Sequence, residues 1–182
     1  MRTVALASPS RSQAEVSALR VAVVAALSAT MMLFASLASA LLVRRAFEDW
    51  RPAAAAWPWI LLGFGLAASA GMEIAGRSLG SLRVAGFAIL GLSSGLYLAG
   101  ALFVLGSLVS GPYGLSRPHD AFIALLLGVH VLHAILGTAF AARVLRAASG
   151  GSSETDFALA RLVTHFLTAL LVFILALLFL PR

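Results

Sequence analysis

The chain has 182 residues, of which 61% are hydrophobic and only 11% are charged. A soluble domain carries about 25% charged residues, so the composition excludes a water-facing surface over most of the molecule. The net charge of +6 comes from 13 arginines, most of them between apolar runs. This distribution favours membrane topology signals and headgroup contacts over nucleic-acid binding, which needs a basic stripe with exposed aromatics. There is no cysteine, which excludes disulfides and thiolate metal sites.

Five apolar runs follow a polar segment at residues 1–20, and each is long enough to cross the hydrocarbon core, which takes about 20 residues. Because the runs lack strand-like alternation, the sequence predicts an all-α, polytopic transmembrane helical bundle over residues 21–182. The first run is too long for a signal peptide and ends in Arg44 and Arg45 without a clear cleavage site. The predicted spans are, in order, Val21 to Val43, Trp57 to Gly76, Val84 to Val109, His119 to Ala142 and Leu162 to Leu180.

The segments between the spans differ in arginine content, and this difference predicts the orientation of the chain. By the positive-inside rule, we expect the N-terminus and the Gly/Ser-rich loop Ser149–Asp156 in the cytoplasm, with Arg182 outside. That loop is also predicted to be the most flexible. In this orientation the inner arginines are Arg2, Arg11, Arg20, Arg77, Arg83, Arg143, Arg146 and Arg161, and the outer ones are Arg44, Arg45, Arg51, Arg117 and Arg182.

The third predicted span contains a ridge of small residues, Gly91, Gly95 and Ala99. Helices in membranes associate by close contact, which small residues permit. We therefore expect this ridge to pack closely against a helix, either in the bundle or in another membrane protein.

Glu73 is an acidic residue predicted to lie inside the second span. It lies one turn before Arg77, on the same helix face, so the simplest interpretation is an acid that reaches toward this arginine near the interface. The alternative is a carboxylate that relays protons or contacts lipid.

His130 and His133 are three residues apart and share one face of the fourth span, which Ala134, Gly137 and Ala141 continue. A face of histidine and small residues is typical of helix–helix packing, where histidine can bond to a neighbouring helix.

His165, in the fifth span, lies beside Thr164 and Thr168. The alternative for the three histidines is metal or haem ligation, but two histidines one turn apart on one helix do not hold a haem between them. We also find no nucleophile–base pair, phosphate loop or carboxylate dyad, so the sequence predicts no catalytic, cofactor-binding or metal residue.

Two spans resemble segments of subunit III of the haem–copper oxidases. Leu126–His133 is similar to the family segment T-G-x-H-x-x-H: Gly128, His130 and His133 match, and Leu127 is at the threonine position. Thr164–Phe166 is similar to the segment W-H-F-V-D near the end of that family. Its histidine and phenylalanine match, while threonines occupy the tryptophan and aspartate positions, the latter being Thr168.

The first span resembles the family segment S-E-x-M-x-F…R. Met32, Phe34 and Arg44 match, and Thr30 is at the glutamate position. The tryptophan and proline of the loop that follows, Trp50 and Pro52, are also similar. The order and spacing agree over nearly the whole chain, and five spans suit the short form of the family that lacks the first two helices.

The resemblance implies a non-catalytic subunit of a respiratory terminal oxidase in the bacterial plasma membrane. Such a subunit binds the catalytic subunit I, together with subunit II and phospholipids, and supports assembly and sustained proton uptake. Haem and copper are then expected in the partner subunits and no cofactor on this chain. Because threonines replace the family's glutamate and aspartate, a proton-handling role of those two positions is not carried over. Seven residues are then candidates for a structural role, a subunit interface or a lipid contact: His130, His133, His165, Glu73, Arg44, Gly128 and Gly137.

Three alternatives stay open from the sequence. The chain is also similar to the accessory subunit of nitric oxide reductase. A stand-alone membrane protein that binds metal or haem through its histidines is the second, and a transporter is the third, although the chain has neither an internal repeat nor a pair of broken helices.

Overall fold

The computed structural model describes residues 13–47, 56–77, 81–112, 114–148 and 154–179, apart from the side chains of residues 77, 81–82 and 145–148. It confirms the predicted all-α bundle, because five helices account for nearly all of this part of the chain, which contains no strand. All five are long and apolar enough to span a membrane, as in a multi-pass membrane protein. The helices are α1 (Gln13–Arg45), α2 (Trp57–Arg77), α3 (Ser81–Ser110), α4 (Pro118–Ala148) and α5 (Glu154–Phe179).

The helices extend beyond the predicted spans. α1 begins at Gln13 rather than Val21, and α5 begins at Glu154, inside the segment expected to be a loop. Hydropathy marks only the part of a helix that crosses lipid, whereas the helix continues into the headgroup region. Acidic side chains in the first turn, Glu15 in α1 and Glu154 in α5, oppose the positive end of the helix dipole and favour these early starts.

Prolines lie in the first turn of two helices, and a glycine in the left-handed region lies in the turn before one of them. Pro58 lies in the first turn of α2 and Pro118 is the first residue of α4, where a missing backbone N–H costs nothing. Before α4, Gly114 has a φ of 51°, which is the left-handed region, and donates to the carbonyl of Gly111 at 2.9 Å.

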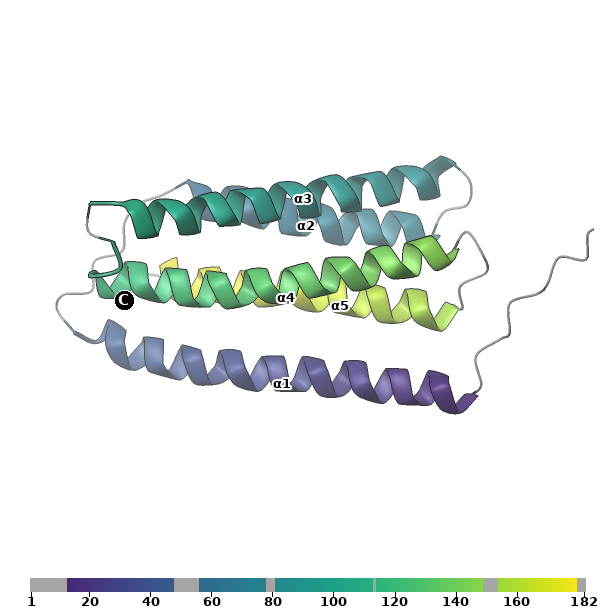
Figure 1. Cartoon of the computed structure of the whole chain (residues 1–182), viewed down its shortest axis with the longest axis horizontal. Helices are drawn as coiled ribbons and strands as arrows, with labels where there is room; N and C mark the ends of the chain where they lie inside the picture. Colours follow the sequence, from purple (N-terminus) through teal and green to yellow (C-terminus); the bar gives the residue numbers. More distant parts are fainter. Residues whose placement is uncertain (1–12, 48–55, 78–80, 113, 149–153, 180–182) are drawn as a thin grey trace, which may run out of the picture.

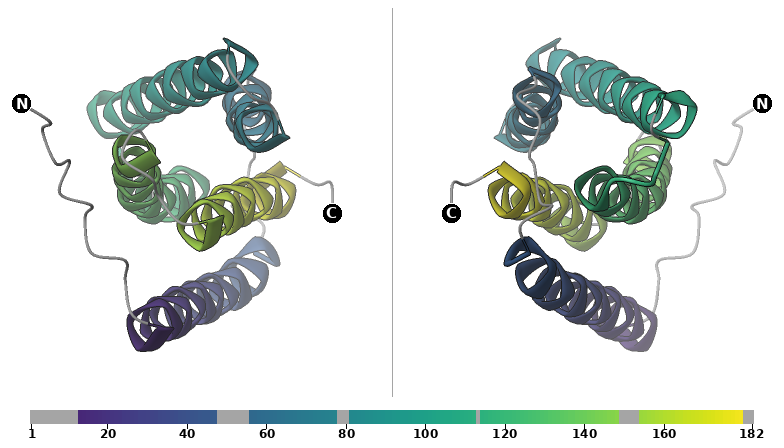
Figure 2. Two further views of the ribbon diagram at one scale, coloured as in Figure 1. Left: turned by 90° about the vertical axis from the view of Figure 1, so that its right-hand side faces the viewer. Right: turned by 90° about the vertical axis from the view of Figure 1, so that its left-hand side faces the viewer.

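Consecutive helices run in opposite directions (Figure 1). Viewed along the bundle, α2 to α5 form a ring of four helices, and α1 lies outside it (Figure 2). Among the five described helices, those that α1 contacts are α5 and α4. Its buried residues form one stripe, Thr30, Phe34, Ala38 and Leu41, all in the C-terminal part of the helix.

The closest approach of two helices joins α2 to α3. A Cβ atom at Gly86 would lie 2.5 Å from the backbone nitrogen of Ala75, and one at Gly71 would lie 2.7 Å from that of Leu90. Only glycine fits here, because the obstacle is backbone. The expected close packing at Gly91 and Gly95 differs from this: a Cβ at either would meet nothing within 4 Å. The expected tight contact at this ridge is therefore not found within the described residues, and Gly91 lines a cavity instead.

The core lies inside the ring and along its seam with α1. Large apolar side chains such as Leu61, Leu127 and Leu171 fill the ring, and Phe34 of α1 packs with Leu126 and Ile174 of α4 and α5. The outer surface is also apolar: Phe103 is 78% exposed and Met32 is 73% exposed. A surface of this kind matches lipid.

Candidate functional site

His130 connects three helices from the interior of the ring. It is 2% exposed, and its Nε2 bonds to the carbonyl oxygen of Leu167 on α5 at 2.9 Å. Because a carbonyl oxygen only accepts, the hydrogen is on Nε2, and Nδ1 must accept from the hydroxyl of Tyr97 on α3 at 2.5 Å. Both ring nitrogens are therefore used in bonds between helices, as expected from the sequence, and neither has a lone pair left for a metal.

Glu73 meets α5 on the side of the bundle where α2 and α5 pack. Its Oε1 accepts a hydrogen bond from Nε2 of His165 at 2.7 Å and lies 3.7 Å from Nε of Arg161. The expected partner was Arg77, whose side chain lies outside the described residues. A carboxylate in a membrane span is costly unless paired, and here a neighbouring helix supplies the donors.

One turn further along α5, at the same interface with α2, the polar contacts are made by hydroxyl groups and not by charged groups. Thr168, at the family's aspartate position, bonds to the carbonyl oxygens of Gly65 and Thr164, at 3.1 Å each, and accepts from Ser69 at 2.8 Å. Thr30, at the glutamate position, is 7% exposed and donates to the carbonyl of Ala26 at 2.9 Å. Both threonines are thus satisfied by neutral groups.

His133 differs from the expectation of a hydrogen bond to another helix. Its Nδ1 donates to the carbonyl of Val129, one turn earlier on α4, at 2.8 Å. Its contact with a neighbouring helix is instead aromatic: the ring meets Phe34 of α1 edge-on, with centroids 6.0 Å apart.

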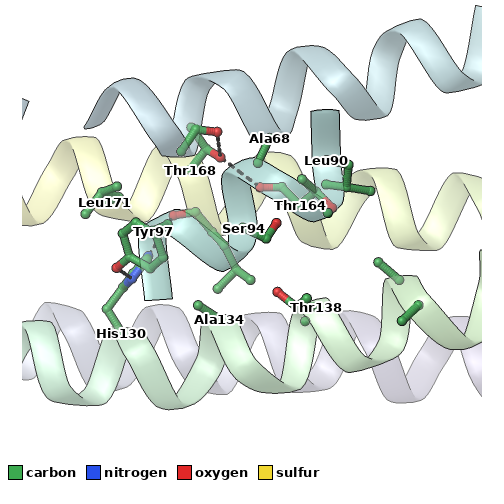
Figure 3. Close-up of a pocket in the computed structure, with 16 residues that line it drawn as sticks. Ala68, Leu90, Ser94, Tyr97, His130, Ala134, Thr138, Thr164, Thr168 and Leu171 are labelled. Atoms are coloured by element: carbon green, nitrogen blue, oxygen red, sulfur yellow. Dashed lines mark hydrogen bonds between the residues drawn. The ribbon is translucent and has the colours of Figure 1, made fainter. Parts of the chain in front are cut away.

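A cavity of about 110 Å³ lies inside the ring of α2 to α5. Its wall is mostly apolar, but hydroxyls of Ser94 and Thr138 point into it beside the Tyr97–His130 pair (Figure 3). The Thr164 and Thr168 side chains complete the polar part of the wall, and a dashed line in the figure marks a bond of this pair. The polar side chains of three helices therefore gather in one place in an otherwise apolar bundle.

The two candidate glycines behave differently. A Cβ at Gly137 would lie 2.5 Å from Cδ1 of Leu167 and 3.2 Å from Cγ1 of Val163, both on α5. A Cβ at Gly128 would meet nothing within 4 Å. Gly137 therefore lets α4 approach α5, whereas Gly128 has no packing role against the described residues.

At the C-terminal end of α1, two arginines interact with polar and aromatic groups. The guanidinium of Arg44 lies 5.0 Å from the centre of the Phe47 ring, and Arg45 donates to the carbonyl of Leu177 near the end of α5 at 2.7 Å. A cation at the C-terminal end of a helix is favourable. Trp50 and Pro52, which also resemble the family, lie outside the described residues.

Sequence reasoning missed four contributors: Tyr97, Ser69, Arg45 and His119. His119 is 2% exposed, lies 3.6 Å from Asp120 and meets the ring of Phe179 edge-on at 5.9 Å. Because His119 is at the edge of the predicted span, the sequence did not indicate that its side chain is buried. Tyr97 could have been found from the sequence, because it is a tyrosine within an apolar span and a buried tyrosine hydroxyl needs a hydrogen-bond partner.

Comparison of the chain with family models, with curated proteins and with solved structures finds no match in any of the three. The contacts described above are therefore the basis for a functional assignment.

Proposed function

We propose that this chain is a non-catalytic subunit of a respiratory haem–copper terminal oxidase, of the subunit III type, in the bacterial plasma membrane. One observation carries the proposal: the two segments that resemble the family meet in the structure and are used to hold helices together. His130 of the fourth span bonds to Leu167 of the fifth, and His165 of the fifth bonds to Glu73 of the second. Such use suits a scaffold that stabilises a catalytic partner.

The first span fits the same role. Phe34 is fully buried against the bundle, whereas Met32 of the same segment is 73% exposed. α1 therefore attaches through one stripe and leaves most of its surface for lipid or for subunit I. Under this proposal haem and copper belong to subunits I and II, the N-terminus is cytoplasmic, and phospholipids cover the remaining surface.

Affinity purification from native membranes tests the partnership. We expect the tagged full-length chain to bring down a haem–copper catalytic subunit, identified by mass spectrometry and by its optical spectrum. Purification with a nitric oxide-reducing catalytic subunit would favour the alternative accessory role. Purification as a homo-oligomer, or a Soret band in the isolated folded chain, would contradict the proposal.

A further inference from the structure

A groove separates α1 from α4 and α5. The buried stripe of α1 begins only at Thr30, and nearer its N-terminus the helix meets α5 through the bond from Arg20 to the hydroxyl of Thr155, at 3.1 Å. The groove lies between these two contacts. The space left has a volume of about 180 Å³, and Val23, Ala26 and Leu27 of α1 line one wall. The opposite wall includes His133 and Phe140 of α4 with Phe166 of α5. An apolar cavity of roughly 150 Å³ is enough to hold a benzene ring.

The two polar side chains in this groove can accept hydrogen bonds but have no hydrogen left to donate. Nδ1 of His133 carries its hydrogen to the carbonyl of Val129, which leaves Nε2 of the neutral ring as a lone pair. Within the described part of the chain, Nε2 has no hydrogen-bond partner. The Thr30 hydroxyl likewise gives its hydrogen to Ala26 and keeps only lone pairs. A ligand that matches this groove must therefore donate.

The depth of His133 restricts the ligand further. It is the central residue of α4, with 15 residues on either side (118–132 and 134–148). At a rise of 1.5 Å per residue, it is about 22 Å from each helix end, which is more than half of a hydrocarbon core of about 30 Å. Polar headgroups do not reach this depth. A donor that binds here must dissolve near the middle of the membrane.

Aromatic side chains contribute to the groove and to the packing of His133. Phe34 meets the His133 ring edge-on, with 68° between the planes, and Phe140 and Phe166 line the same space. Such a wall favours a planar ring by offset or edge contacts.

From the acceptor-only polar groups, the mid-membrane depth and the aromatic wall, we propose that the α1–α4–α5 groove binds the reduced ring of a membrane quinol, with one ring hydroxyl donating to Nε2 of His133. The isoprenoid tail leaves between α1 and its neighbours into the lipid. The oxidised quinone has only carbonyl oxygens, so it cannot make this bond, and the groove distinguishes the two redox forms. The inference does not depend on the proposed oxidase partnership.

Binding to the full-length chain in lipid nanodiscs tests the proposal, with decylubiquinol and decylubiquinone as probes under anaerobic conditions. We expect the quinol to bind about tenfold more tightly than the quinone, because one hydrogen bond to the acceptor nitrogen of His133 is gained. His133→Phe keeps an aromatic ring but removes the acceptor, and should bring the quinol affinity down to that of the quinone. Leu132→Phe, which places the same new ring on the exposed face of α4, is the matched control and should change neither affinity.

Ala26→Phe fills the groove from its exposed wall and should remove binding of both probes, while circular dichroism and thermal unfolding report the fold. Equal affinities for quinol and quinone would show that the groove takes apolar chains without recognition, and would overturn the proposal. Unchanged quinol binding in Ala26→Phe would place the site elsewhere and overturn it as well. These two results are decisive even if His133→Phe fails to fold.

Discussion

The α2–α3 pair and the seam between α1 and the ring show two ways in which helices of one membrane chain associate. At Gly71 and Gly86 the backbones of α2 and α3 touch, and no side chain intervenes. Along α1 the contact is made by side chains of a single stripe, and a groove stays open beside it. In lipid, close contact drives association, so we infer that the glycine pair fixes the ring, while the looser seam leaves room for a ligand or a shift of α1.

The largest expected effect is at the glycine contact. Gly86→Leu should destabilise the bundle by about 3 kcal/mol, because the new side chain collides with the backbone of Ala75, which cannot rotate away. Thermal unfolding in detergent measures it. Gly95→Leu, on the open face of the same helix, is the control and should shift stability by less than about 0.5 kcal/mol. Equal losses of stability in both variants would contradict the proposed difference between the packed and the open face of α3.

A smaller loss is expected where the obstacle is side chain. Gly137→Leu meets Leu167 and Val163 of α5, which can change rotamer, so we predict a loss of about 2 kcal/mol in the same unfolding measurement. Gly128→Leu has open space around it and should be tolerated. If Gly128→Leu proved the more harmful of the two, a partner or a different packing of α4 would have to cover that position.

The polar contacts inside the ring should matter less than its shape. His130→Phe leaves the buried hydroxyl of Tyr97 without its partner and should cost about 1 kcal/mol. A double-mutant cycle with Tyr97→Phe sharpens this: once the hydroxyl is gone, the cost of His130→Phe should fall. Strictly additive losses would mean that the bond between the two side chains contributes nothing.

The smallest effect is predicted at the half-buried ion pair. Glu73→Gln keeps an oxygen that can accept from His165 but loses the attraction to Arg161, and should cost less than about 1 kcal/mol. The unfolding temperature at low and high salt is the measurement, with a smaller difference between variants at high salt. A loss comparable to that of Gly86→Leu would show that the pair, and not the glycine contact, dominates α2.

Hydropathy alone predicted the five helices, since each span must be apolar over about 20 residues. The face of His130, Ala134 and Ala141 was also predictable from its spacing, and all three residues are buried. Partners across helices were not predictable, because Gly71 and Gly86, or Glu73 and His165, become neighbours only in the folded bundle.

His130 and His133 illustrate the limit most clearly. Three residues correspond to about 60° around a helix, and that rotation is enough to turn one histidine toward the interior of the ring and the other toward the groove beside α1. The shared face that the sequence predicted therefore serves two different spaces.

The central claim is that the buried polar contacts of this chain, such as that of His130, stabilise the bundle and do not take part in turnover. The claim rests on the proposed function, and its most direct test uses the complex with the proposed haem–copper catalytic subunit. The measurement is oxygen consumption per catalytic haem, followed over time, with this subunit quantified in the same sample. With His130→Phe still bound, we predict a near-normal initial turnover followed by a shorter enzyme lifetime or weaker retention of the subunit. An immediate and complete loss of turnover, with the subunit fully retained, would contradict the account.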